Sequence, residues 1–90
     1  MAQRAVAELL EPGEYLVCYD MPRMSGLWGV LVAPSPSSIR KKFPELTIVD
    51  WLPPWMTEAE VAAMRHRSLR LEDDTPQGLL RALIADREGN

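Results

Sequence analysis

The segment from Glu14 to Ala33, EYLVCYDMPRMSGLWGVLVA, constrains the fold more than any other part of the chain. Its two ends are apolar and rich in β-branched and aromatic residues, and they flank a short connection that contains Pro22, Ser25 and Gly26. This arrangement is typical of a β-hairpin. Because both faces of each strand are apolar, we expect helices to cover one face of the sheet. Loops, the N-terminal segment or a second subunit are expected on the other face.

The rest of the chain predicts four helices and one more strand. Ser35 before Pro36 marks the start of a helix, because serine caps a helix and proline fits its first turn. Thr57 and Glu60 have the spacing of a capping box, which opens another helix. The expected elements are helices at about 3–10, 36–43, 57–67 and 75–87, and a strand at about 46–51.

These elements predict a single small α+β domain over residues 1–90, with the element order α-β-β-α-β-α-α. The sheet is expected to have three strands: the hairpin and a third strand, reached through a right-handed crossover helix. Helices pack against it. On the last helix, Leu79, Leu83 and Ile84 lie at helical spacing, so we expect them in the core.

Composition and charge exclude several classes of function. The net charge of −3 and the lack of a basic face argue against nucleic acid as a partner. The longest apolar run, residues 27–33, is far shorter than the ~20 residues that cross a bilayer. The single cysteine cannot form an internal disulfide, and no export signal is visible. We therefore expect a cytoplasmic protein without a membrane partner.

Catalytic and metal-binding patterns are not visible in the sequence. The one cysteine, Cys18, and the one histidine, His66, do not make a zinc site with carboxylates that are scattered along the chain. No pair of acid and base residues has a recognisable spacing. We expect no metal and no cofactor, and we expect Cys18 to be a buried, unreactive thiol.

The tryptophans are the best indication of an interaction. Trp51 and Trp55 border a stiff Leu-Pro-Pro segment, and Met56 follows directly. Tryptophan and methionine are enriched in protein interfaces, although tryptophan also closes cores. The sequence favours a non-enzymatic protein–protein interaction module, such as a regulator, an immunity or antitoxin-like protein, or a helper protein. A protein partner or a second copy would bind through Trp28, Trp51, Trp55 and Met56.

An alternative is a small enzyme or ligand-binding protein with a site near the hairpin turn. Asp20 stands at the exit of a strand, where many α/β proteins place catalytic or metal-binding groups, although aspartate also forms turns. Tyr19 and Arg23 are the other candidates for this site, with Trp28 beside them. A deep pocket around these residues would favour the alternative, and a flat apolar patch would favour the interaction module.

Three resemblances to known families can be stated. The words YLVCYD, GLWGVLVAPS, SIRKKFPELTIV and PPWMT, within residues 14–57, are similar to those of short uncharacterised bacterial proteins. This resemblance implies a compact stand-alone domain and no particular activity. YLVCYDMPR resembles the first strand of the CRISPR-associated Cas2 proteins, which continue into a long helix where this chain has SGLW. YLV and SGLW also resemble MbtH-like proteins, whose aromatic–proline words do not follow here.

Overall fold

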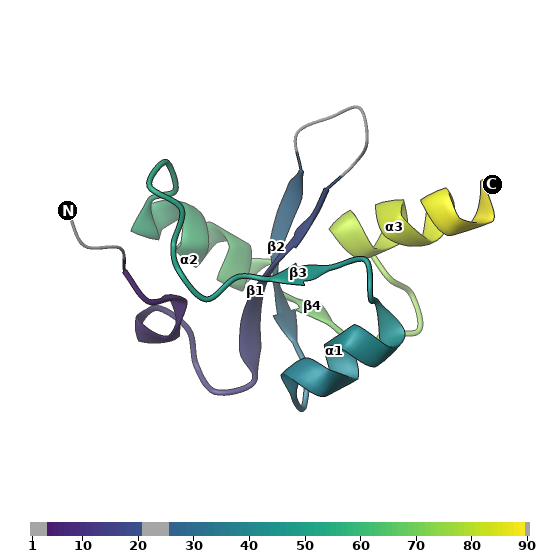
Figure 1. Ribbon diagram of the computed structural model, residues 1–90, viewed down its shortest axis with the longest axis horizontal. Coiled ribbons are helices and arrows are strands. Elements are labelled where there is room, and N and C mark those ends of the chain that lie inside the picture. The colour runs from purple at the N-terminus through teal and green to yellow at the C-terminus, as the bar shows by residue number, and fades with distance from the viewer. Residues whose placement is uncertain (1–3, 21–25, 90) are drawn as a thin grey trace.

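The computed structural model describes residues 4–20 and 26–89, which are arranged around a four-stranded mixed sheet (Figure 1). The described part confirms the predicted α+β class. In chain order its elements are the 3₁₀ helix η1 (Val6–Glu8), β1 (Glu14–Tyr19), β2 (Leu27–Val32), α1 (Pro36–Lys42), β3 (Thr47–Ile48), α2 (Glu58–His66), β4 (Leu69–Arg70) and α3 (Gly78–Glu88).

The predicted hairpin is confirmed in β1 and β2, which pair antiparallel from Glu14 opposite Val32 to Tyr19 opposite Leu27. The register stays regular through Gly29, so this glycine does not mark a bulge. An ideal Cβ at Gly29 would lie 2.7 Å from Cδ2 of Leu79. Glycine at this position therefore lets α3 approach the strand closely. The connection at 21–25 lies outside the described residues.

The sheet differs from the predicted three strands, since its order is β3-β1-β2-β4. The fourth strand, β4, pairs parallel with β2, with Leu69 opposite Leu31 and Arg70 opposite Val32. Two residues are too few to show a periodic pattern, which is why the sequence did not predict this strand. On the other side of the hairpin, β3 pairs antiparallel with β1. Consequently β2 and β3 run parallel on either side of β1, and α1 forms the crossover between them.

The third strand is shorter than the predicted segment 46–51, because the backbone changes partner after Val49. The Val49 amide still donates to the Leu16 carbonyl of β1 at 2.9 Å. Beyond it, the chain pairs with the N-terminal segment: the Val6 amide donates to Asp50 at 2.9 Å and the Leu52 amide donates to Arg4 at 2.8 Å. The predicted N-terminal helix at 3–10 contracts to the three residues of η1.

Local capping signals correctly located the starts of two helices. In α1, the Ser38 amide donates to Ser35 Oγ, and the Ser35 amide donates to Ser38 Oγ, both at 3.2 Å. In α2, Thr57 and Glu60 form the predicted capping box, with distances of 3.1 and 3.2 Å. The last helix begins at Gly78, later than the predicted residue 75.

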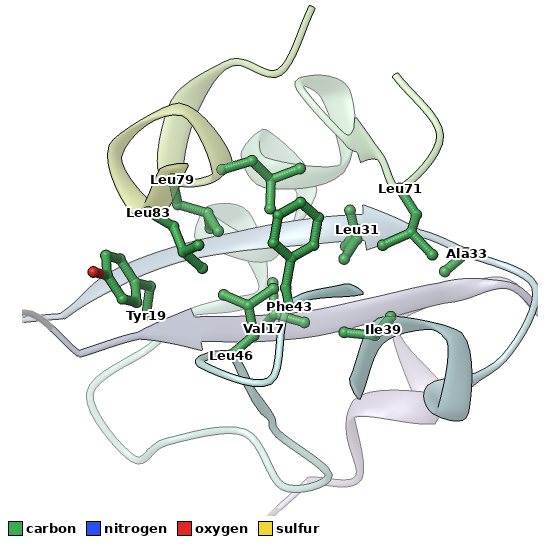
Figure 2. Packing of buried hydrophobic residues seen from close by; sticks show 11 residues of the cluster. Val17, Tyr19, Leu31, Ala33, Ile39, Phe43, Leu46, Leu71, Leu79 and Leu83 are labelled. Atoms are coloured by element: carbon green, nitrogen blue, oxygen red, sulfur yellow. The ribbon is translucent and has the colours of Figure 1, made fainter. Parts of the chain in front are cut away.

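One face of the sheet packs against α1 and α3. Figure 2 shows Leu79 and Leu83 of α3 directed toward the strands, with Phe43 close to them. Both leucines are buried as predicted, whereas Ile84 is only partly buried against the same cluster. The buried members of this first core cluster are Val17, Tyr19, Leu31, Ala33, Ile39, Phe43, Leu46, Leu71, Leu79, Leu80 and Leu83.

The opposite face of the sheet is covered by η1, α2 and the loop that precedes α2 (Figure 1). The buried members of this second core cluster are Val6, Leu16, Val30, Leu52, Met56 and Val61. The expected cover by the N-terminal segment and a loop is present, and α2 adds to it. Both sheet faces are thus covered by elements of the same chain. None of the helices that the structure describes is long and apolar enough to cross a bilayer.

Candidate functional site

Trp51 and Trp55 stand out on the described surface as large apolar side chains, 55% and 59% exposed. The segment that carries them is nevertheless anchored, because Leu52 and Met56 are buried in the second core cluster. The Met56 amide also donates to the Pro53 carbonyl at 3.0 Å. The alternation of buried and exposed side chains therefore presents the two indole rings to solvent on a fixed backbone. Met56 itself supports this segment from inside.

Trp55 is joined to the sheet through Trp28 of β2. The two indole rings meet edge to face, with their centroids 5.4 Å apart and an angle of 84° between their planes. This T-shaped geometry is favoured by the quadrupoles of aromatic rings. Trp28 is half-buried. Trp51 lines a different cavity, of about 640 Å³, with residues of η1, β1 and β3.

A groove of about 450 Å³ lies beside Trp28. Its floor is the first half of β2, and its walls come from the end of α2 and the start of α3. The lining residues are Leu27, Trp28, Gly29, Met64, Arg67, Leu69, Gly78 and Leu79. A second cavity of about 560 Å³ adjoins it, shares Arg67, Leu69 and Gly78 with it, and adds Arg70.

The groove exists because β4 is shorter than β2. Within the residues that the structure describes, β4 pairs only with Leu31 and Val32, at the C-terminal end of β2. Residues 27–29 run past the start of β4, so this part of the strand borders the groove instead of another strand. Sequence reasoning missed the groove because its outline depends on β4, which has no signature in the sequence. Gly29, a glycine inside the second strand of the hairpin, was the nearest available signal.

The residues of the alternative site have separate surroundings. The Tyr19 hydroxyl donates to Asp86 Oδ2 of α3 at 2.6 Å, and this hydrogen bond, together with burial, raises the pKa of Tyr19. Asp20 is exposed, and its Oδ1 accepts a hydrogen bond from Cys18 Sγ at 3.5 Å. Arg23 lies outside the described residues. Within the described ranges, Tyr19 therefore links β1 to α3, while Asp20 interacts with its own strand.

Metal-binding groups are not assembled in the described part of the chain, where no three His, Cys, Asp or Glu side chains come together. His66 is exposed at the end of α2. Among the charged side chains, Arg87 of α3 forms an ion pair with Glu45. This pair links α3 to the turn after α1. The Glu45 pKa is lowered by the hydrogen bond from Arg87.

Cys18 is expected to react slowly with thiol reagents in the native protein. Its side chain is buried, and burial followed by the hydrogen bond to Asp20 raises its pKa from 9.0 to about 11. At pH 8 this change alone reduces the reactive thiolate about a hundredfold. The measurement is the rate of iodoacetamide labelling at pH 8 in native protein and in urea-unfolded protein. Equal rates in the two states would show an accessible, ionised thiol instead.

Comparison with protein-family models, curated proteins and solved structures found no match.

Proposed function

We propose that this protein is a non-enzymatic protein–protein interaction module whose contact surface contains Trp51, Trp55 and Trp28. The observation that supports it is the exposure of two tryptophans, each by more than half, on an anchored segment. Tryptophan is strongly enriched among the residues that dominate binding energy at protein interfaces. Exposed apolar patches on a small protein also commonly mark interaction sites.

The backbone of this surface is ordered before a partner arrives. Pro53 and Pro54 restrict the chain between the two exposed rings, and Leu52 and Met56 are buried on either side of them. Binding through a rigid aromatic surface loses less conformational entropy than binding through a mobile loop. This pre-organisation is a second reason to assign the tryptophans to an interface.

The partner is either a different protein or a second copy of this chain. A second copy is not required to cover the sheet, because the two core clusters occupy both of its faces. We therefore favour a different protein, as expected for a regulator, an immunity or antitoxin-like protein, or a helper protein. A homodimer through the exposed tryptophans is the alternative.

The proposal is tested by affinity capture from a lysate with three baits. These are the wild-type protein, the double variant Trp51→Ser/Trp55→Ser, and a control, Arg40→Ser/Lys41→Ser, which changes exposed residues of α1. We expect at least one protein to be captured by the wild type and the control but lost from the tryptophan variant. Identical captured sets from all three folded baits would contradict the proposal. Sedimentation at micromolar concentration identifies a second copy as the partner.

A further inference from the structure

The outer edge of β2 carries backbone groups that β4 does not reach. Successive residues of a strand direct their N–H and C=O groups to opposite edges. The Val32 carbonyl accepts from the Leu71 amide at 3.0 Å, which shows that Val32 faces the β4 side. Trp28, four residues earlier, faces the same side. Because β4 pairs with Leu31 and Val32, the backbone N–H and C=O of Trp28 border the groove without a strand partner among the described residues.

The walls of the groove fit an extended chain with apolar side chains. Leu27 and Leu79 lie toward the first core cluster, whereas Trp28 and Met64 lie toward the second. Side chains of an added strand alternate between the two faces of the sheet, so they would meet apolar surface on both sides. Gly29 has no side chain, so its backbone forms part of the floor of the groove. At about 3.3 Å per residue, the segment from Leu27 to Gly29 matches about three residues of an added strand.

The rim of the groove is basic. Arg67 lines both the groove and the adjoining cavity, and Arg70 lines the latter. Both arginines are exposed, and neither has an ion pair within residues 4–20 and 26–89. Asp73 also borders the second cavity, where its Oδ1 accepts a hydrogen bond from the Thr75 amide at 3.0 Å. Its negative charge offsets one of the two arginines, so the lining of the groove and this cavity keeps an excess of one positive charge. An acidic side chain on the incoming segment would complement this rim.

We infer that this groove binds an extended, apolar segment of a partner protein, flanked by an acidic residue, which adds as a strand to the open edge of β2 beside Trp28. Such strand addition gains affinity from main-chain hydrogen bonds and specificity from the alternate side chains. Only an extended backbone can pair with the edge of Trp28 in this way. The inference rests on the proposed function and names the partner's binding segment.

The test uses the immobilised wild-type protein to select binding peptides from a phage library. The library displays random twelve-residue sequences. We expect the enriched peptides to contain a short apolar, β-branched run next to Asp or Glu. A synthetic peptide of the enriched sequence should bind the Arg67→Glu variant about tenfold more weakly than the wild type. The matched control is Arg40→Glu on α1, which should bind as the wild type does.

Amide hydrogen exchange distinguishes strand addition from side-chain docking. In saturating peptide, exchange of the Trp28 amide proton should slow about tenfold or more, because the peptide backbone becomes its acceptor. The Gly29 amide faces β1 and provides an internal control that should change little. No enrichment over empty beads, no effect of Arg67→Glu, or an unchanged Trp28 amide would each overturn the inference. If lysate capture still depends on Trp51 and Trp55 in that case, the proposed function stands without this groove.

Discussion

Replacing Leu83 with alanine is expected to lower the free energy of unfolding by about 2–5 kcal/mol. Leu83 is fully buried at the contact of α3 with the sheet, so its truncation both loses apolar burial and leaves a cavity (Figure 2). Urea denaturation followed by circular dichroism measures the change. Arg81→Ala, an exposed change on the same helix, is the control and should stay within about 0.5 kcal/mol of the wild type. An unchanged midpoint for Leu83→Ala would show that α3 does not pack in this way.

Replacing Leu16 with alanine is expected to destabilise the protein by a similar amount, about 2–5 kcal/mol. Leu16 is fully buried in the second core cluster, on the face that η1 and α2 cover. The same denaturation experiment applies, with exposed Thr47→Ala in the neighbouring strand as the comparison. A small effect at Leu16 at a protein concentration where the chain is monomeric would mean that this face is open in solution. In that case, a second copy of the chain would be needed to cover this face of the sheet.

Local signals in the sequence predicted the parts of the fold that local chemistry determines. The hairpin followed from two apolar runs around a turn, and its bounds agree with the structure to within one residue at the ends. The helix starts at Ser35 and Thr57 followed from side chains that hydrogen-bond amides three residues away. In each case, the interacting groups are close in sequence.

The errors concern contacts between distant segments. A two-residue strand such as β4 forms because α2 delivers Leu69 to the edge of β2, and no short window of sequence contains that information. The third strand was predicted too long because its apolar, β-branched pattern continues to Trp51, whereas the backbone beyond Val49 pairs with the N-terminal segment and no longer with β1. Tertiary pairing therefore overrides local propensity at these points.

The sequence singled out the tryptophans as candidate contact residues but did not place them in the fold. The sequence left open whether the tryptophans are core or surface, because tryptophan serves both purposes. In the structure Trp51 and Trp55 are exposed, Trp28 is half-buried, and Met56, which the sequence grouped with them, belongs to the core. The groove between α2 and α3 depends on four separate elements, so it had no sequence signature.

Because residues 4–6 pair with residues 50–52, the two edges of the sheet differ in how readily they can accept a further strand. On the β3 side, the N-terminal backbone pairs with the Asp50 carbonyl and the Leu52 amide, whereas on the β2 side Trp28 is bordered by a groove. For many copies to join edge to edge, as in fibrils, each copy needs two sheet edges that can accept a strand. If two copies paired through their β2 edges, both of these edges would be occupied. The assembly would therefore stop at a dimer. We therefore expect the N-terminal segment to hinder the addition of a further strand at residues 50–52.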